Sequence, residues 1–327
     1  MTSTTNRPGT SRLLRVTMAT LSLALLAGCV DGPAMPAAPE LAPSLGNGFG
    51  EHGGGRPGSI AFGSRQDGGP PEIWVMNADG GDPVQLTNSP GPVAINGQPD
   101  WSPSGQWIAF MSTRTGDAEI FVMESDGSGQ KNLTNHRATD QAPSWSPNGQ
   151  QIAFQSNRDG NFELYVLDLR TGELTRLTTH AGVDQFPDWS PNGKEIAFQR
   201  DGDIYVMDLR TAETTRLTFT PQMEDMPTWS PNGKQIAFMS QRDGYPAVYV
   251  MDADGGNQVN LTPRPAGVTT PWQSAWPGWS KNGQRIYFQG ARPETAGDVE
   301  IFVIGSEGGD AVRLTYTPGI DSAPVAR

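Results

Sequence analysis

Residues 189–208 read WSPNGKEIAFQRDGDIYVMD, and close copies of this stretch recur along the chain. Its apolar triplet Ile-Ala-Phe, with Tyr for Ala in the last copy, ends at six phenylalanines, namely Phe62, Phe110, Phe154, Phe198, Phe238 and Phe288. Successive phenylalanines lie 40 to 50 residues apart. Self-similarity at a period of this length is the signature of a repeat architecture, so the repeat unit decides the fold.

Each repeat predicts four short strands. In the copy around Trp145, a Pro-Asn-Gly turn at residues 147–149 joins the Trp strand to the apolar strand, as in a β-hairpin. Residues 163–167 alternate with the period of two that a strand requires, and residues 176–178 are predicted to form a short fourth strand. Six such units side by side predict an all-β fold, a six-bladed β-propeller of four-stranded antiparallel blades over residues 59–327.

The ends of the repeat region predict how the ring closes. The first unit begins at Ser59, in the apolar strand, and has no Trp strand before it. Residues 321–327, DSAPVAR, match residues 140–146, DQAPSWS, with Ala326 in the position of Trp145. The C-terminal strand is therefore predicted to complete the first blade, which removes the open sheet edges that would otherwise promote aggregation.

Composition and charge narrow the function. The chain has 40 Gly, 28 Pro and 9 Trp in 327 residues, which suits short strands and tight turns, and we expect the repeated Trp rings to pack between blades. The formal net charge is −12, and so acidic a surface repels phosphate backbones. Nucleic acid is therefore excluded as a partner, whereas cations, basic protein surfaces and neutral glycans are not.

The N-terminal segment resembles a bacterial lipoprotein signal. Residues 16–28, VTMATLSLALLAG, form an apolar run that follows three arginines and is too short to span a bilayer comfortably. The sequence LAGC at residues 26–29 places Cys29, the one cysteine of the chain, where such signals are cleaved and acylated. We expect residues 1–28 to be a signal peptide and Cys29 to carry lipid. An ordinary signal peptide with an incidental cysteine is the alternative.

The segment that follows predicts a tether. Residues 29–58 are rich in Pro, Ala and Gly and show neither the helical nor the strand period. Together these segments predict a periplasmic protein that is held to a membrane through an N-terminal lipid anchor. Val30, rather than Asp, follows the cysteine, which favours the outer membrane in a Gram-negative host.

The repeat resembles that of TolB-type six-bladed propellers. In the third repeat the resemblance rests on Pro143, Trp145, Pro147, Gly149, residues 152–154, residues 158–160 and residues 177–178. It extends over residues 59–327 and is specific for the fold but not for the function. The resemblance implies that one mouth of the propeller channel binds a partner, and that the partner is an envelope protein or a peptidoglycan-associated lipoprotein.

No catalytic or metal-binding motif accompanies the repeat. The sequence has no G-x-S-x-G nucleophile elbow, no H-E-x-x-H and no cysteine pair. We therefore expect no catalytic residue, metal ligand or cofactor, and the leading hypothesis is a cell-envelope lipoprotein that acts as a non-catalytic protein-binding scaffold. The alternative is a hydrolase or lyase that acts on an envelope glycan or peptide at the channel mouth, with an acid as general base.

A polar, mostly acidic position lies five residues before each Trp of the repeat, or before Ala326. The residues in this ring position are Asn96, Asp140, Asp184, Glu224, Ser274 and Asp321. The propeller symmetry would gather them around one mouth of the channel, where they could seat a basic side chain or a cation such as calcium. The alternative is that each acid caps its loop or pairs with an arginine of the turn between the second and third strands, namely Arg65, Arg114, Arg158, Arg200 or Arg242.

Two histidines lie at equivalent positions of neighbouring repeats. His136 and His180 each follow a Leu-Thr pair by two residues. We include them among the candidate binding residues, because two imidazoles at equivalent places could contribute to a metal site. The alternative is that a duplicated repeat retained the same loop residue twice.

Overall fold

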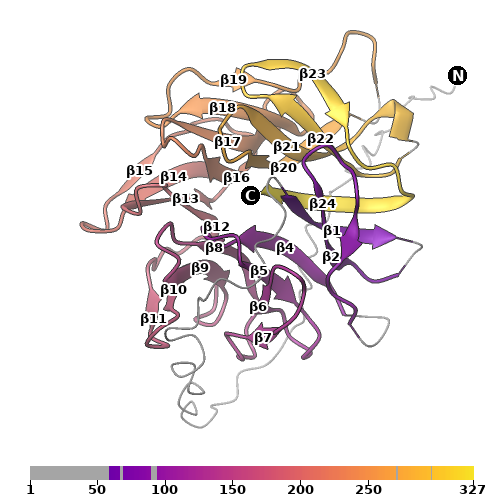
Figure 1. The fold of residues 1–327 in the computed structure, drawn as a ribbon. Helices are drawn as coiled ribbons and strands as arrows, with labels where there is room; N and C mark the ends of the chain where they lie inside the picture. Colours follow the sequence, from indigo (N-terminus) through magenta and orange to yellow (C-terminus); the bar gives the residue numbers. More distant parts are fainter. Residues whose placement is uncertain (1–58, 67–68, 90–93, 270–271, 296) are drawn as a thin grey trace, which may run out of the picture. The chain divides into compact units, whose positions relative to one another are not determined.

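The repeat folds into six four-stranded antiparallel sheets, which are the blades of a β-propeller (Figure 1). The computed structural model describes residues 59–66, 69–89, 94–269, 272–295 and 297–327. The predicted signal peptide, Cys29 and the tether therefore lie outside the described residues. Apart from the 3-10 turn η1 (Pro293–Thr295), every element of the described residues is a strand. No helix in these ranges has both the length and the apolar surface that a membrane span requires.

We number the blades from the N-terminus and give the strands of each blade from the innermost to the outermost. Blade 1 combines both ends of the repeat region in β24 (Gly319–Ala326), β1 (Ser59–Gln66), β2 (Glu72–Asn77) and β3 (Val84–Gln85). Blade 2 consists of β4 (Asn96–Trp101), β5 (Trp107–Ser112), β6 (Glu119–Glu124) and β7 (Lys131–Asn132). Blade 3 consists of β8 (Asp140–Trp145), β9 (Gln151–Ser156), β10 (Glu163–Asp168) and β11 (Leu174–Arg176).

The other three blades repeat this order. Blade 4 consists of β12 (Asp184–Trp189), β13 (Glu195–Arg200), β14 (Asp203–Asp208) and β15 (Thr214–Arg216). Blade 5 consists of β16 (Glu224–Trp229), β17 (Gln235–Ser240), β18 (Ala247–Asp252) and β19 (Val259–Asn260). Blade 6 consists of β20 (Gln273–Trp279), β21 (Arg285–Ala291), β22 (Glu300–Gly305) and β23 (Gly308–Arg313).

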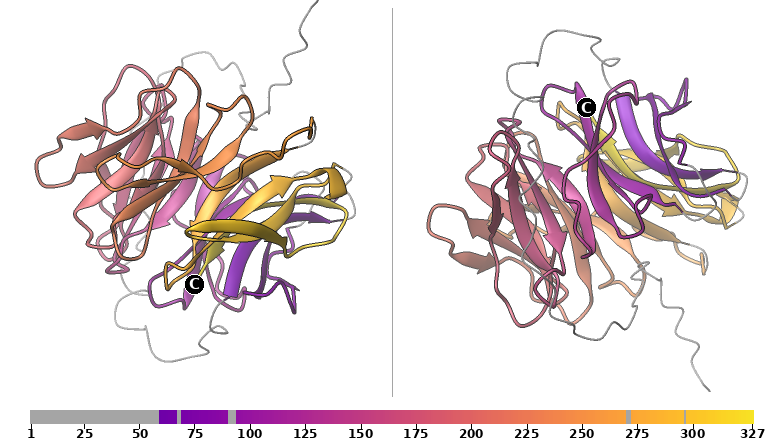
Figure 2. Two further views of the ribbon diagram at one scale, coloured as in Figure 1. Left: turned by 90° about the horizontal axis from the view of Figure 1, so that it is seen from above. Right: turned by 90° about the horizontal axis from the view of Figure 1, so that it is seen from below.

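The C-terminal strand closes the ring, as the sequence predicted. β24 pairs with β1 in antiparallel register, with Ala326 opposite Ile60 and Asp321 opposite Ser64. Figure 2 shows this last strand of the chain beside the first. The six innermost strands contact one another in cyclic order, from β4 through β8, β12, β16, β20 and β24 back to β4. Each blade therefore has a neighbour on both of its faces.

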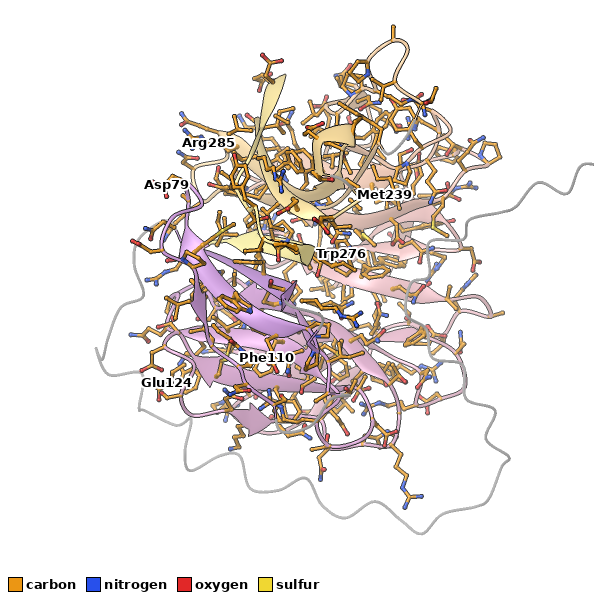
Figure 3. The ribbon with its side chains drawn as sticks, turned by 90° about the vertical axis from the view of Figure 1, so that its right-hand side faces the viewer. Asp79, Phe110, Glu124, Met239, Trp276 and Arg285 are labelled. Carbon is orange, nitrogen blue, oxygen red and sulfur yellow. The ribbon has the colours of Figure 1, made fainter. Side chains whose placement is uncertain are left out.

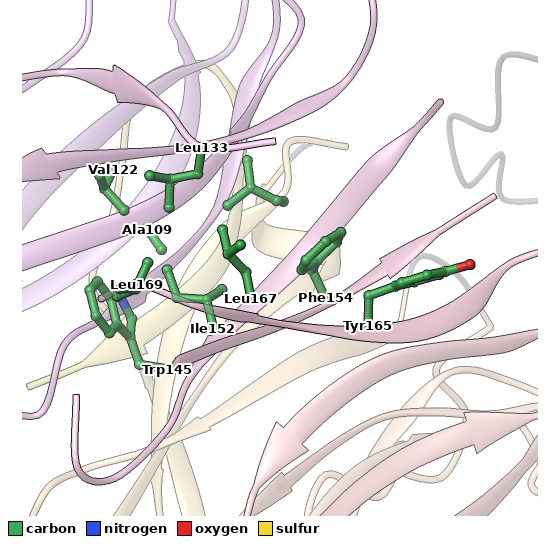
Figure 4. Close-up of a cluster of buried hydrophobic side chains, with 10 residues drawn as sticks. Ala109, Val122, Leu133, Trp145, Ile152, Phe154, Tyr165, Leu167 and Leu169 are labelled. Carbon is green, nitrogen blue, oxygen red and sulfur yellow. The ribbon is translucent and has the colours of Figure 1, made fainter. Parts of the chain in front are cut away.

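The hydrophobic core is divided into six clusters, and each cluster lies between two consecutive blades. Figure 4 shows the cluster between blades 2 and 3, in which Ala109 and Leu133 of blade 2 pack against Trp145 and Phe154 of blade 3. Equivalent tryptophans occupy four other clusters, and Ala326 takes their place between blades 6 and 1. The structure thus confirms that the repeated Trp rings pack between blades.

The apolar triplet explains why both faces of a blade are covered. Because successive side chains of a strand point to opposite faces, Ile152 and Phe154 join the cluster with blade 2, whereas Ala153 joins the cluster with blade 4. The small alanine leaves room for Trp189 of the next blade, which lies in the same cluster. Pairing a bulky face with a small one lets identical repeats fit side by side.

Each innermost strand carries a β-bulge at the same place. The register shifts within every one of these strands, and the residue at the shift has a positive φ of 49° to 54°. The six residues are Gln98, Ala142, Phe186, Met226, Trp276 and Ala323, and a proline follows each of them. Such a backbone conformation costs about 1 kcal/mol for a residue other than glycine, and bulges bend a strand and redirect its side chains.

The fourth strand begins earlier than the sequence predicted. β11 ends at Arg176, so residues 177–178 follow the strand instead of forming it. The Oγ1 atom of Thr178 accepts a hydrogen bond of 2.9 Å from the backbone N–H of Leu164, in place of a backbone carbonyl. The Leu-Thr pair of the repeat thus ends the blade with a side-chain cap.

Candidate functional site

A channel of about 370 Å³ runs through the centre of the propeller. Its wall is built from the innermost strands, and the proline that follows each bulge contributes to it in all six blades. These prolines are Pro99, Pro143, Pro187, Pro227, Pro277 and Pro324. Because proline fixes φ and the bulges are held by pairing with the second strand, the wall is rigid along its whole circumference.

One half of one channel mouth is apolar. The side chains of Phe186, Met226 and Trp276 line the channel from blades 4, 5 and 6, and we call these three residues the apolar half-mouth (Trp276 is labelled in Figure 3). The rings of Phe186 and Trp276 meet edge to face with their centroids 5.4 Å apart, although blade 5 lies between their blades. The same positions of blades 2, 3 and 1 hold Gln98, Ala142 and Ala323. The sixfold symmetry is therefore broken at this mouth.

Two loops at the end of the propeller where the innermost strands begin expose large apolar side chains. Both loops lead from an outermost strand to the next innermost strand, and their sequences are alike: RLTFTPQME at residues 216–224 and RLTYTPGID at residues 313–321. Phe219 and Tyr316 are 71% and 70% exposed, and Met223 and Ile320 are each 46% exposed. The sequence analysis missed these loops, although the shared motif in two of the six repeats was a signal that could have revealed them.

Two carboxyl groups face the channel inside the mouth. Asp100 and Asp188 precede a repeat Trp, and their Oδ2 atoms each accept a 2.7 Å hydrogen bond from a backbone N–H of the next blade, that of Trp145 and that of Trp229. Burial raises the pKa of Asp100 to about 8, and the nearby charge of Asp188 contributes to the shift. Burial also raises the pKa of Asp188 to about 7. The sequence contained a signal for these two carboxyl groups, because the residue before the repeat Trp is Asp in blades 2 and 4 but Ser or Thr in blades 3 and 5.

The residues of the predicted ring position are buried. Asn96, Asp140, Asp184, Glu224 and Ser274 are 0% exposed and Asp321 is 2% exposed. In blades 3, 4 and 5 an arginine pairs with the acid: Arg158 Nη2 lies 2.9 Å from Asp140 Oδ2, Arg200 makes two bonds of 2.7 Å to Asp184, and Arg242 Nε lies 3.0 Å from Glu224 Oε1. The alternative that each acid pairs with an arginine therefore describes these three blades.

The same arginines stack on aromatic rings. The guanidinium carbon of Arg158 lies 5.5 Å from the ring centroid of Phe154 and 4.8 Å from that of Tyr165. Equivalent stacking occurs in blades 2, 4, 5 and 6, and we call the guanidinium with its two rings and its ring-position residue an arginine cage. Phe110, labelled in Figure 3, provides one ring of the cage in blade 2.

The cages correct the predicted arrangement of the acids. Asp140, Asp184 and Glu224 do not line the mouth as free carboxylates, because their charge is used within each blade. In blades 2 and 6 the cage holds a neutral residue, since Arg114 donates to the Oδ1 atom of Asn96 and Arg292 to the Oγ atom of Ser274. A part for these residues in partner binding stays a prediction.

Arg65 does not belong to the set of cage arginines in which the sequence analysis placed it. It is exposed, and its Nε atom donates to the carbonyl of Gly69 at 3.0 Å. The cage arginines of blades 2, 3 and 5 follow the triplet phenylalanine by four residues, whereas Arg65 follows Phe62 by three. Successive side chains of an extended segment point to opposite faces, so a shift of one residue places the side chain on the opposite face of the sheet.

The two predicted histidines close their own loops. The Nδ1 atom of His136 accepts a 3.0 Å hydrogen bond from the N–H of Ala138, and that of His180 accepts an equal bond from Gly182. The repeated histidine thus has the same structural role in both loops. Among the described residues, no group of three His, Cys, Asp or Glu side chains could hold a metal ion.

Comparisons with known proteins agree with this fold. The family model described as the TolB beta propeller domain matches residues 127–203, and that of the Tricorn protease N-terminal beta propeller domain matches residues 192–294. Among curated relatives, a Tol-Pal system protein TolB of Desulfosudis oleivorans is 35% identical over 80 residues, which are 24% of this chain and 16% of that protein. A protein of Agrobacterium fabrum is 39% identical over 64 residues, 20% of this chain and 21% of that protein. The matches thus span about a fifth or less of these relatives.

Solved structures extend the similarity over most of the chain. TolB from Acinetobacter baumannii is 26% identical with a TM-score of 0.72, and the match covers 82% of this chain and 66% of that one. An oligogalacturonate lyase in complex with manganese matches 80% of this chain and 73% of its own with a TM-score of 0.51, but at 16% identity this likeness shows the fold alone. The chain therefore contains a TolB-like six-bladed β-propeller.

The arginine cages yield a stability prediction. Replacing Arg158 with Met leaves the buried carboxylate of Asp140 without its partner, so we expect the free energy of unfolding to fall by about 3 kcal/mol or more, measured by urea titration. The control is Arg65→Met, which removes an exposed arginine outside any cage and should change the same quantity by less than about 0.5 kcal/mol. Equal effects of the two substitutions would contradict the assignment of the cages.

The carboxyl of Asp100 yields a prediction about pH. Its pKa is raised from 3.8 to about 8, so the folded protein keeps a proton that the unfolded chain releases. The resulting stabilisation is present below about pH 4 and is lost as the pH rises through about 8. Asp100→Asn should therefore gain stability relative to the parent protein as the pH rises from about 4 to about 8, by about 1 kcal/mol per pH unit, and the difference should level off above about pH 8. The exposed Asp310→Asn is the control, and a parallel pH profile for parent and Asp100→Asn would refute the prediction.

Proposed function

We propose that the protein is a non-catalytic, protein-binding propeller of the bacterial cell envelope, and that it captures a segment of a partner protein at the channel mouth that bears Phe186, Met226 and Trp276. The observation that carries this proposal is the asymmetry of that mouth. Half of it is apolar, and the exposed Phe219, Met223, Tyr316 and Ile320 add apolar surface where the chain enters two of the innermost strands. Exposed apolar side chains around a concave site are typical of protein-binding surfaces.

The charges of the propeller favour binding over catalysis. Three of the ring-position acids are closed in arginine cages, so they offer neither a general base nor a nucleophile to a substrate. Asp100 and Asp188 are the specific observation that supports the alternative, a hydrolase or lyase that acts on an envelope glycan or peptide, because paired carboxyls with raised pKa values can serve as acid and base. One oxygen of each is already bonded to the backbone of the next blade, which is the arrangement of a structural cap.

The proposed partner is an envelope protein or a peptidoglycan-associated lipoprotein. The support is the similarity to proteins named for the Tol-Pal system.

The first prediction of this proposal concerns the mouth. Replacing Phe186, Met226 and Trp276 together with alanine removes the apolar contacts and should reduce capture of the partner by about tenfold or more, measured by crosslinking in intact cells. The control is Val84→Ala with Val259→Ala, which removes exposed apolar side chains from outermost strands. Undiminished capture by the triple variant would move the site elsewhere. Turnover of an envelope glycan or peptide by the pure protein would favour the enzyme.

The second prediction concerns the anchor. If Cys29 is the lipidated N-terminus of the mature protein, Cys29→Ser should move the protein from the membrane fraction to the soluble fraction, because a hydrocarbon chain contributes about 0.8 kcal/mol of membrane affinity per buried methylene. Immunoblotting of both fractions measures this distribution. If Cys29→Ser stays in the membrane fraction, the lipid anchor is ruled out. The propeller should unfold at the same temperature in both proteins.

A further inference from the structure

Blade 1 has the parts of an arginine cage except the arginine. Its triplet phenylalanine, Phe62, pairs with Trp74 across β1 and β2, as Phe154 pairs with Tyr165 in blade 3. Asp321 occupies the ring position and stands opposite Ser64 in the register, as Asp140 stands opposite Ser156. The blade thus combines an aromatic pair, a hydroxyl and a carboxylate in the same register as in blade 3.

The arginine itself is replaced in the sequence of blade 1. Four residues after the triplet phenylalanine, where blades 2, 3, 5 and 6 have Arg114, Arg158, Arg242 and Arg292, blade 1 has Gln66. The neighbouring Arg65 is exposed and bonds the carbonyl of Gly69, so its guanidinium is engaged outside the cage. Blade 4 has a shorter turn, yet Arg200 still reaches Asp184 with two bonds. Blade 1 therefore differs from every other blade in this respect.

Two polar atoms in blade 1 lack the arginine partner that the cage of blade 3 supplies. Within the part of the chain that the structure describes, the Oδ2 atom of Asp321 and the Oγ atom of Ser64 have no hydrogen-bond partner, although these residues are only 2% and 1% exposed. In blade 3 the equivalent Ser156 hydroxyl accepts a 2.9 Å bond from Arg158 Nε. A buried carboxylate oxygen without a partner is costly, and burial raises the pKa of Asp321, although nearby hydroxyl groups and the charge of Arg313 oppose the shift.

One ring of the aromatic pair in blade 1 is less covered than its counterparts in four of the other blades. Trp74 is partly exposed, whereas the equivalent rings of blades 2, 3, 5 and 6 are buried. Those buried rings, Phe121, Tyr165, Tyr249 and Phe302, each lie beneath a guanidinium with its carbon 4.6 to 5.1 Å from the ring centroid. Tyr205 of blade 4 is partly exposed as well, although Arg200 lies over its ring, so the exposure of Trp74 shows that this ring is accessible and not that a cation is missing.

We propose that the cage of blade 1, formed by Asp321, Ser64, Phe62 and Trp74, binds the guanidinium group of an arginine side chain that a partner protein supplies. The carboxylate accepts charge-assisted hydrogen bonds, the hydroxyl accepts a further bond as Ser156 does, and the rings attract the cation by cation–π interaction. The other blades provide the template for each of these contacts. The site lies outside the channel and goes beyond the function proposed above.

The direct test uses a single arginine side chain as the probe. N-acetylarginine amide should bind the full chain at one site in calorimetric titration, about tenfold or more tightly than N-acetylcitrulline amide, which has the same shape without the charge. Asp321→Asn should weaken the arginine probe by a similar factor, whereas Asp310→Asn, at an exposed position, should not. Equal binding of the two probes, or unchanged binding to Asp321→Asn, would overturn the proposal.

A second variant tests the proposal without removing a buried charge partner. Gln66→Arg restores the arginine spacing of blades 2, 3, 5 and 6 and should fill the cage from within, so the melting temperature should rise by a few degrees and binding of the arginine probe should be lost. Gln222→Arg is the matched control, because it adds the same charge to an exposed loop, and it should retain probe binding. Probe binding that survives Gln66→Arg would show that the probe sits elsewhere. Because the probe is a small molecule, this outcome does not depend on whether the channel mouth captures a protein.

Discussion

The burial of each blade between two neighbours is the constraint on which the rest of this structure depends. All six hydrophobic clusters lie between blades, so a blade has no core of its own. Each blade instead contributes one face to each of two clusters. A linear array of such units would leave an apolar face open at each end. The pairing of β24 with β1 removes both ends at once, and it requires the same side-chain pattern in the last residues of the chain as in every Trp strand.

The arginine cages give a structural role to a buried set of charged residues of the repeat. A buried ion pair adds little net stability over an apolar equivalent, because removing both charges from water is costly. Its geometric demand is strict, however: Arg158 must reach across from the turn after β9 to Asp140 at the start of β8 while it lies on Phe154 and Tyr165. We infer that the cages fix the turns at one end of the propeller, which leaves the channel and the unmatched residues to carry function.

The sequence predicted the strands, their order and the closing strand, because periodic apolar residues and turn motifs are local signals. It did not predict the burial of Asp140, Asp184 and Glu224. Their spacing of five residues from a Trp gives their position around the propeller axis, but it does not show how far each side chain is buried. The bulges were hidden for a physical reason: Phe186, Met226 and Trp276 belong to residue types that avoid positive φ, and only the tertiary structure holds them there. The position of Arg65 could have been found by counting from Phe62, because one residue separates it from the cage spacing.

Departures from the repeat carry information that the repeat itself cannot. A mouth with six equal sectors would accept a partner in six equivalent orientations, and each would be populated alike. In this propeller the apolar half-mouth marks blades 4, 5 and 6, and the cage without an arginine marks blade 1. Two unlike features at different angles around one axis define a single orientation, because an apolar anchor and a guanidinium on the same partner can reach both only one way round. Specificity on a symmetric scaffold then comes from which blades break the pattern, and the intact blades supply the rigidity that holds these features at fixed positions.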